Sequence, residues 1–245
     1  MKQITQKNIK NQAVVIPGSK SISHRMMICA SLSNGTSNIK NLLQSDDIKH
    51  TIDALKQMGA DIDQVKGTHY RVAGFGGNPK PCNKDIYLGN SGTSMRLLAG
   101  VAALGNTGYT LTGDQRMCER PMVELLDALT GLGICAKSEN KKGTPPVYIQ
   151  GGNRAGGSVK IDCSKSSQFL SSILMIGALM KNGLDIFLDS PPVSSPYVDL
   201  TIDIMKKFTI KAHQISNMHY QVPGQQSYLQ GNFFVEPDLS NAGYF

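Results

Sequence analysis

The feature that most constrains the fold of this chain is a long internal repeat. Its three copies are "TIDALKQMGADI", "LLDALTGLGICA" and "TIDIMKKFTIKA". Gly59, Gly133 and Thr209 align near the end of the copies, at intervals of 74 and 76 residues. Apolar residues three and four positions apart, as at Ile52 and Leu55, predict an amphipathic helix. A period this long exceeds that of solenoid repeats, so it indicates three copies of a complete α/β unit.

Each unit also has a second helix and a closing strand. The second helices begin at small-residue turns, "GSKSISHR", "GNSGTSMR" and "DCSKSSQF". The closing strands are "HYRVAG", "PVYIQG" and "HYQVPG". An apolar strand, "VVI", is expected before the first turn, so each unit is predicted to run β-α-β-α-β-β. The helix "SSQFLSSILMIGALM" is apolar on all sides, which predicts burial. We therefore expect an inside-out α/β barrel-like domain, with three repeats packed around buried helices.

Composition excludes several classes of function. The five cysteines are scattered and odd in number, and the five histidines lack metal-ligand spacing. We therefore expect reduced thiols, a cytoplasmic location, and neither a metal nor an organic cofactor. No apolar run approaches the roughly 20 residues of a membrane span, so no membrane contact is expected. The net charge of +7 is dispersed and aromatic residues are few, which favours small anions over nucleic acid as ligands.

Basic residues occur where helices are predicted to begin. Lys20, Arg120 and Lys165 lie at or just before such starts, and Arg25 and Arg96 lie about one turn inside. A helix N-terminus has unpaired N–H groups and partial positive charge, so it binds anions and disfavours cations. Cations there are explained if an anion binds between the side chain and the helix. Pro121 is expected as the first residue of the helix that follows Arg120.

Other polar residues near these starts have two readings. Gly92 serves the turn or a ligand equally well, and Ser194 caps a helix or binds a ligand. Ser166, Ser167 and Gln168 could merely cap the helix that they open, although an amide beside a buried run suggests a ligand contact for Gln168. Two further pairs, Asp46 with Asp47 and His24 with His50, resemble acid–base groups. The aspartates are better explained as helix caps, and the histidines are assigned no chemistry.

Taken together, these motifs resemble the 5-enolpyruvylshikimate-3-phosphate synthase family. The matching segments, in chain order, are "PGSKSISHR", "LGNSGTSMR", "RMCERPM", "SSQFLSSILM", "VSSPYVDLT" and "VEPDLSNAGYF". The resemblance implies transfer of the enolpyruvyl group of phosphoenolpyruvate to the 5-hydroxyl of shikimate 3-phosphate, with release of phosphate. It also implies a place in aromatic amino acid biosynthesis, no cofactor, and a monomer when the enzyme is complete.

The resemblance also implies a role for individual residues. Shikimate 3-phosphate would contact Lys20, Ser21, Arg25, Ser166, Ser167, Gln168, Ser194 and Tyr197. Phosphoenolpyruvate would lie near Gly92, Arg120, Gln168 and Lys20. Lys20 is the candidate catalytic residue, and carboxylate acid–base residues are expected in a second domain.

The chain resembles about half of the family enzyme. Residues 13–231 are expected to form the three-repeat substrate-binding domain. Residues 1–12 are expected to belong to the second domain, and residues 232–245 to cross into it. We therefore expect weak binding of shikimate 3-phosphate and negligible turnover from these 245 residues alone.

Two alternatives stay open at this point. The related enolpyruvyl transferase that acts on UDP-N-acetylglucosamine has the same fold, and Cys118 lies near an arginine, but its Asn-rich opening motif and catalytic cysteine loop are not found. A non-catalytic half-domain that binds a phosphorylated metabolite is the other alternative.

Overall fold

The computed structural model describes residues 15–238, in three consecutive α/β units. The first unit contains α1 (Lys20–Leu32), β1 (Thr36–Lys40), α2 (Asp46–Gln57), β2 (Asp61–Lys66) and β3 (His69–Ala73). The second contains β4 (Ile86–Tyr87), α3 (Gly92–Ala103), β5 (Gly108–Thr112), the 3-10 helix η1 (Met117–Glu119), α4 (Val123–Gly131), β6 (Cys135–Ser138) and β7 (Val147–Gln150). The third contains β8 (Gly157–Ile161), α5 (Ser167–Gly177), β9 (Leu184–Leu188), α6 (Pro196–Lys207), β10 (His213–Ser216) and β11 (His219–Val222). The short strand β12 (Asn232–Phe234) follows.

Each unit forms a four-stranded sheet of the same topology. The orders are β12-β1-β3-β2, β4-β5-β7-β6 and, in reverse, β10-β11-β9-β8. Strands β4 and β8 pair in parallel with the next strand of their own unit. In the first unit that place belongs to β12, whose Phe233 aligns with Ile39 of β1. The expected strand before the first turn is therefore wrong for residues 15–17, which are not in a strand.

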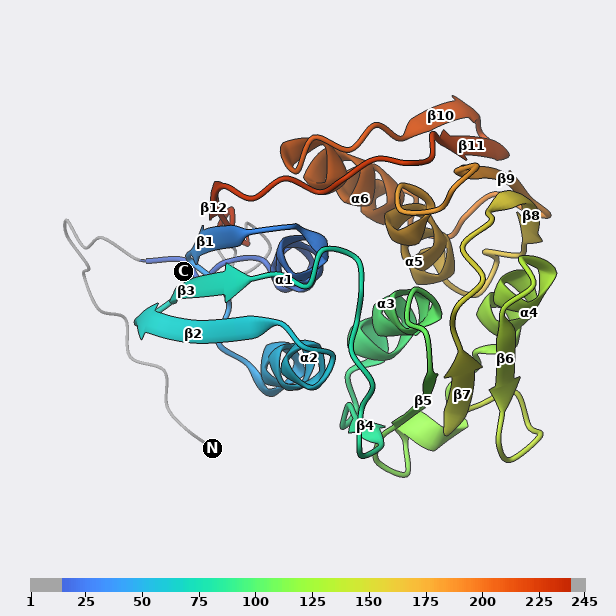
Figure 1. Ribbon diagram of the computed structural model, residues 1–245, viewed down its shortest axis with the longest axis horizontal. Helices are drawn as coiled ribbons and strands as arrows, with labels where there is room; N and C mark the ends of the chain where they lie inside the picture. Colours follow the sequence, from blue (N-terminus) through green and yellow to red (C-terminus); the bar gives the residue numbers. More distant parts are fainter. Residues whose placement is uncertain (1–14, 239–245) are drawn as a thin grey trace, which may run out of the picture.

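The helices lie inside and the sheets outside (Figure 1). Helices α1, α3 and α5 are buried along most of their length. In α5 every residue except Gln168 is buried, as its apolar sequence predicts. Burying these helices against one another and under three sheets removes most large apolar side chains from water, which is the main stabilising contribution to the fold. The inside-out α/β architecture is confirmed.

The repeat alignment is confirmed by backbone conformation. The second helix of each unit in chain order, α2, α4 or α6, is followed by a residue with positive φ. These residues are Gly59, Gly133 and Thr209, with φ angles of +101°, +76° and +69°. A residue in the left-handed region ends a helix, and glycine adopts that region without a steric penalty. Thr209 does so with a β-branched side chain, which is a genuine outlier.

The two ends of the described chain lie side by side. Gly18 forms an antiparallel bridge with Pro237, and the Ser19 amide donates to the Glu236 carbonyl at 2.9 Å. Because residues 232–234 pair with β1, this part of the expected crossover belongs to the first sheet. Residues 1–12 and 239–245 lie outside the described residues, and the assignment of both ends to a second domain stays a prediction. None of the helices within 15–238 is long and apolar enough to cross a bilayer.

Candidate functional site

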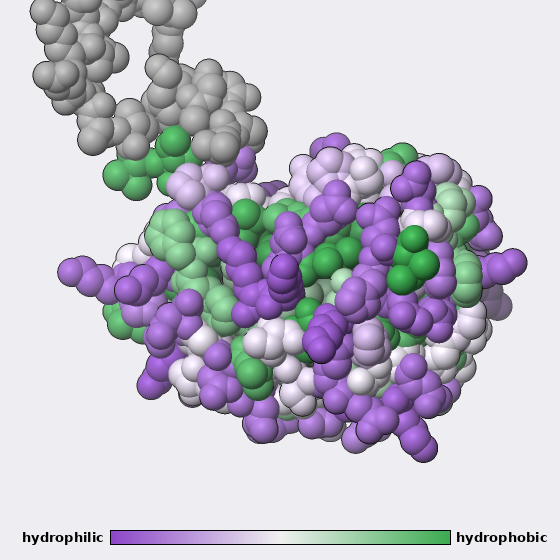
Figure 2. Space-filling view, turned by 90° about the horizontal axis from the view of Figure 1, so that it is seen from above, coloured by the Kyte–Doolittle hydropathy of each residue, from purple (hydrophilic) through white to green (hydrophobic). Residues whose placement is uncertain are grey.

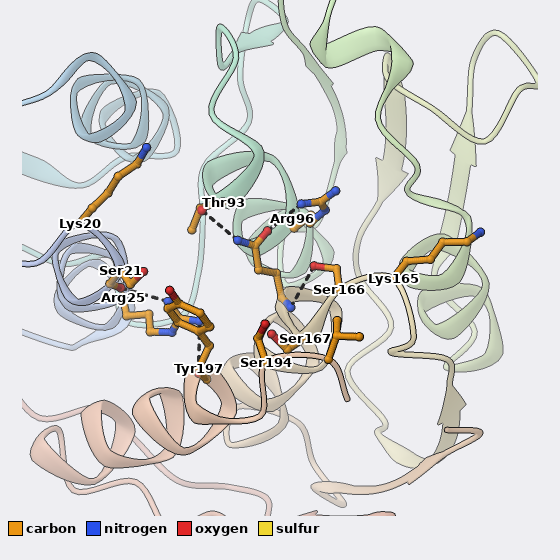
Figure 3. A pocket seen from close by; sticks show the side chains of 12 residues that line it. Lys20, Ser21, Arg25, Thr93, Arg96, Lys165, Ser166, Ser167, Ser194 and Tyr197 are labelled. Atoms are coloured by element: carbon orange, nitrogen blue, oxygen red, sulfur yellow. Dashed lines mark hydrogen bonds between the residues drawn. The ribbon is translucent and has the colours of Figure 1, made fainter. Parts of the chain in front are cut away.

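Four helix starts meet around one cavity of about 350 Å³. They are the N-terminal ends of α1, α3, α5 and α6, and Figure 3 shows their side chains around the same space. The lining residues are Lys20, Ser21, Arg25, Thr93, Arg96, Lys165, Ser166, Ser167, Gln168, Val193, Ser194 and Tyr197. Four of them are cationic and none is acidic. Helix N-termini and a lining that has cations but no acidic side chain favour the binding of an anion in one concave site.

Most of the residues predicted from sequence come together here. Eight of the ten line the cavity, and Gly92 and Arg120 do not. Figure 2 shows the molecule from above the view of Figure 1, and the surface on this side is mostly hydrophilic, with apolar side chains between the polar ones. Thr93 lines the cavity but was not among the residues predicted from the sequence. It directly follows Gly92 in a small-residue turn, and that turn could have indicated it.

Lys20 is the first residue of α1 and half-exposed. Ser19 makes no side-chain cap, and the first turn has no acidic residue. Lys20 instead forms an ion pair with Asp47 in the first turn of α2. The capping role expected for the aspartates is wrong, because Ser45 caps α2 by accepting from the Ile48 amide. Asp47 is thus the counter-ion of the candidate catalytic lysine.

Arg25 is 1% exposed and lines the inner wall of the cavity. Its Nε donates to Thr201 Oγ1 at 2.7 Å and its Nη2 to Ser171 Oγ at 3.2 Å. It also donates to the carbonyls of Ser21 and Tyr197. Burial lowers the pKa of Arg25 to about 10, so the guanidinium stays charged at neutral pH. Its charge therefore reaches the cavity from a fixed position.

Arg96 and Gln168 join α3 to the start of α5. Arg96 Nη1 donates to Gln168 Oε1 at 2.8 Å, and Gln168 Nε2 donates to Thr93 Oγ1 at 3.0 Å. The guanidinium lies 5.3 Å from the centre of the Phe169 ring. Burial and the nearby Arg120 charge lower the pKa of Arg96. These contacts orient the Gln168 amide, whose role the sequence left open.

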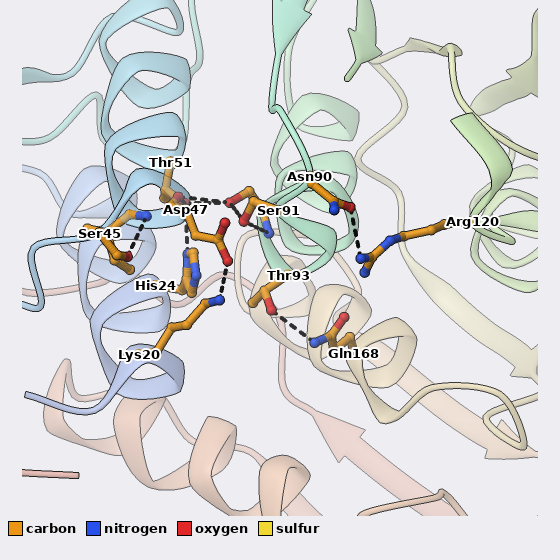
Figure 4. A network of polar contacts seen from close by, with 12 residues as sticks. Lys20, His24, Ser45, Asp47, Thr51, Asn90, Ser91, Thr93, Arg120 and Gln168 are labelled. Atoms are coloured by element: carbon orange, nitrogen blue, oxygen red, sulfur yellow. Dashed lines mark hydrogen bonds and ion pairs between the residues drawn. The ribbon is translucent and has the colours of Figure 1, made fainter. Parts of the chain in front are cut away.

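Arg120 lies beside the cavity, above the first turn of α3. Its Nη2 donates to Asn90 Oδ1 at 2.8 Å (Figure 4). A Cβ on Gly92 would come within 2.5 Å of Arg120 Nη1, so this glycine leaves room for the guanidinium. The expected helix start at Pro121 is wrong, because α4 begins at Val123 and Arg120 follows the 3-10 helix η1. Residues 120–122 lie between the end of η1 and the start of α4.

Small hydroxyl residues surround the start of α5. Ser166 caps the helix by accepting from the Gln168 amide, and Ser167 is 4% exposed. Ser194 is exposed and has φ +56°, in the loop before α6. It is not the residue at the N-cap of α6, which is Ser195. Tyr197 lines the cavity and is 45% exposed.

A buried polar network supports the cavity from the α2 side. His24 Nδ1 bonds Thr51 Oγ1 at 2.8 Å, Thr51 bonds Ser94 at 2.7 Å, and Ser94 bonds Ser91 at 2.5 Å (Figure 4). Burial lowers the pKa of His24 to about 3, so the ring is neutral and fills a structural role. His50 packs edge-on against Tyr87, 5.7 Å between ring centres. Among residues 15–238 no cluster of side chains has the composition of a metal site.

The fold and the cavity define a class of protein: an inside-out α/β domain whose helix starts and cations surround one small polar site. A model of the EPSP synthase family (3-phosphoshikimate 1-carboxyvinyltransferase) matches residues 4–245. The chain belongs to this family.

Individual relatives agree with this assignment. The chain is 41% identical over 240 residues to the 3-phosphoshikimate 1-carboxyvinyltransferase of Marinomonas sp. (strain MWYL1) and 42% identical to that of Colwellia psychrerythraea. Each match covers 96% of this chain and 56% of the relative. The solved EPSP synthase of Acinetobacter baumannii superposes with a TM-score of 0.84 at 29% identity, over 94% of this chain and 51% of that one. The chain therefore spans about half the length of the curated relatives it matches.

Proposed function

We propose that this chain provides the shikimate 3-phosphate-binding half of a 3-phosphoshikimate 1-carboxyvinyltransferase. The observation that carries the proposal is the convergence of four helix starts and four cations on one cavity. The chain's membership of the EPSP synthase family gives the class of ligand. Shikimate 3-phosphate combines a phosphate, a carboxylate and hydroxyls, and these groups match helix N-termini, guanidinium groups and serine side chains.

The two ligands would occupy adjacent parts of the site. Shikimate 3-phosphate fits among Lys20, Arg25, Tyr197 and the serines at the start of α5, which line the cavity itself. Phosphoenolpyruvate fits on the Arg120 side, over Gly92, with Gln168 between the two. This arrangement would place the 5-hydroxyl and the enolpyruvyl carbon next to each other, and orientation of two reactants is a large part of catalysis.

The chain's own residues would contribute electrostatic stabilisation. In the reaction, the 5-hydroxyl adds to carbon 2 of phosphoenolpyruvate and loses its proton, while carbon 3 gains one. The tetrahedral intermediate then loses phosphate and a proton from the same carbon 3. Lys20 would stabilise charge on the departing phosphate, and Arg120 would hold the phosphoenolpyruvate anion. Proton transfer to and from carbon would need carboxylates of a second domain.

Binding and turnover test this proposal separately. Shikimate 3-phosphate is titrated into the 245-residue chain by calorimetry, and phosphate release is then measured with and without a fragment carrying the unmatched part of the Marinomonas relative. We expect weak binding by the chain alone and turnover only after mixing. Lys20→Met should abolish the restored turnover, while Lys40→Met, an exposed change on β1, should leave it intact. Turnover by the chain alone would contradict the prediction that catalysis needs residues of a second domain.

A binding module is the second candidate, because the match covers only 56% of the relative's length. Binding of shikimate 3-phosphate without turnover on mixing would favour it. The UDP-N-acetylglucosamine enzyme is tested at Cys118, which is half-buried with Sγ 3.9 Å from the Gly113 carbonyl. Cys118→Ser should leave the restored turnover unchanged. We also propose a cytoplasmic location. We further propose that the complete enzyme is a monomer, and sedimentation of the mixed fragments as a one-to-one complex would test this.

A further inference from the structure

Lys165 lines the cavity, but the proposed function gives it no role. It directly precedes Ser166, the N-cap of α5, and its side chain is 57% exposed. The family motif quoted above begins at Ser166, so the resemblance assigns nothing to this lysine. A cation at the N-terminal end of a helix is opposed by the helix dipole. Such a position is favourable only if an anion lies close by.

In the structure the anion next to Lys165 is Glu124. Lys165 Nζ lies 2.6 Å from Glu124 Oε1, and Glu124 stands in the first turn of α4. The hydrogen bond to Glu124, and then its charge, raise the pKa of Lys165. Figure 3 shows Lys165 on the opposite side of the cavity from Lys20, with its ammonium group directed away from the other cations. The ion pair thus draws one cation out of the space where a ligand would bind.

The counter-ion itself is incompletely satisfied. The Glu124 side chain is 11% exposed, and Oε2 is buried with no hydrogen-bond partner within residues 15–238. The same holds for Nε of Arg96, which lines the cavity. The Glu124 charge also acts on Arg96. A buried carboxylate oxygen without a donor is costly. The site therefore has one buried acceptor and one buried donor that find no partner among the described residues.

From these contacts we infer that Lys165 is a further phosphate-binding residue and that Glu124 is its exchangeable counter-ion. The inference rests on the proposed function, since the ligand is the phosphate of shikimate 3-phosphate. The phosphate binds at the start of α5, against Ser166 and Ser167, and Lys165 leaves Glu124 to donate to it. Glu124 keeps the electrostatic attraction of Arg96. The ion pair between Lys165 and Glu124 thus competes with the ligand for Lys165. Ligand affinity is lowered by the free energy needed to break that pair.

A purely structural role for the pair predicts different behaviour. The pair joins α4 of the second unit to α5 of the third, so it could simply fasten the two units together. Loss of either partner would then lower the unfolding temperature and leave ligand affinity unchanged. The exchange model instead predicts opposite effects on affinity from the two partners. Removing the lysine weakens binding, and removing the carboxylate tightens it.

Calorimetric titration of the 245-residue chain separates these models. The ligands are shikimate 3-phosphate and shikimate, which lacks the phosphate, and the variants are Lys165→Met, Glu124→Gln and the double change. Lys207→Met serves as the matched control, because it removes one cation from an ion pair on α6 outside the cavity. Lys165→Met should weaken shikimate 3-phosphate binding about tenfold, the effect of one charge-assisted hydrogen bond. Lys165→Met should leave shikimate binding unchanged. The control variant Lys207→Met should leave the binding of both ligands unchanged.

The second variant decides the inference. Glu124→Gln should tighten shikimate 3-phosphate binding several-fold at low salt, with a smaller gain at high salt because the exposed ammonium group of Lys165 is screened by salt. The double variant, which leaves no unpaired carboxylate behind, should bind like Lys165→Met. Equal affinity of the unchanged chain, Lys165→Met and Glu124→Gln would overturn the inference and leave the proposed function intact. No binding of shikimate 3-phosphate by the unchanged chain would overturn both.

Discussion

Arg25 and Thr201 are 176 residues apart in sequence and joined by a 2.7 Å hydrogen bond from Nε to Oγ1. Both side chains are 1% exposed. Thr201 also bonds Ser171 at 2.9 Å, so the guanidinium of α1 is held by α5 and α6 together. The first unit is thereby joined to the third beneath the cavity. An arginine expected from sequence as a ligand contact is also a structural connection between the repeats.

Arg25→Met should therefore destabilise the fold as well as weaken binding. The change leaves the buried hydroxyls of Ser171 and Thr201 without their charged donor, and hydrogen bonds to charged groups contribute about 1.5–3 kcal/mol each. We expect a loss of about 3 kcal/mol in the free energy of unfolding, measured by urea denaturation. Arg71→Met, which removes an exposed arginine paired with Asp63, should lower the free energy of unfolding far less, because exposed ion pairs contribute little to stability. Equal losses for the two variants would show that Arg25 has no structural role.

The sequence predicted the repeat and most of the cavity, because both depend on local patterns. Helix starts follow from small-residue turns, and their likeness in three units places them at equivalent points of three similar sheets. The eight cavity residues found this way lie within about one turn of a helix start or in the loop just before it. Short-range chemistry was enough to find them.

What the sequence did not predict depends on contacts between distant segments. One of the two partners of β1 is β12, nearly 200 residues later in the chain, and no local pattern indicates that pairing. Asp47 resembles a helix cap until Lys20 of another helix is placed beside it. The helix α4 begins at Val123 rather than Pro121, and the Met122 amide just before it donates to the Gly143 carbonyl of the hairpin between β6 and β7. Each difference involves a tertiary hydrogen bond or ion pair that local sequence patterns do not show.

Gly92→Ala should weaken phosphoenolpyruvate binding selectively. The added methyl would lie 2.5 Å from Arg120 Nη1, so the guanidinium has to move away from Asn90. Arg120 is outside the cavity that would hold shikimate 3-phosphate. In the enzyme restored by mixing fragments, we expect the KM for phosphoenolpyruvate to rise roughly tenfold, equivalent to the loss of one charge-assisted contact. The KM for shikimate 3-phosphate should stay within twofold. An equal rise in the two KM values would show that Arg120 contributes to the binding of both ligands.

His24 should make the fold sensitive to acid. Its pKa is about 3 in the folded protein, against 6.5 as the reference, because burial opposes the charged ring. The neutral ring contributes its full stability above pH 6.5, and that contribution falls as the pH decreases toward the folded value. One proton taken up on unfolding corresponds to about 1.4 kcal/mol per pH unit. His24→Asn, which can keep a bond to Thr51, should flatten the decrease in unfolding free energy between pH 6 and pH 4 by about that slope. His213→Asn, at an exposed strand position, should leave the slope unchanged.

Thr209 offers a test of the repeat itself, because a threonine occupies the position where the other units have glycine. Its φ of +69° is unfavourable for a β-branched residue, whereas Gly59 and Gly133 adopt the same region freely. Thr209→Gly should relieve this strain and, after the entropy cost of a more flexible unfolded chain, raise the free energy of unfolding by about 1 kcal/mol. The reciprocal change, Gly133→Thr, adds a Cβ 2.5 Å from Asn153 Nδ2 and should lower it by about 2 kcal/mol. Chemical denaturation of both variants measures the two effects. If Thr209→Gly is destabilising, the threonine is fitted to its site and the three positions are equivalent in backbone conformation but not in energy.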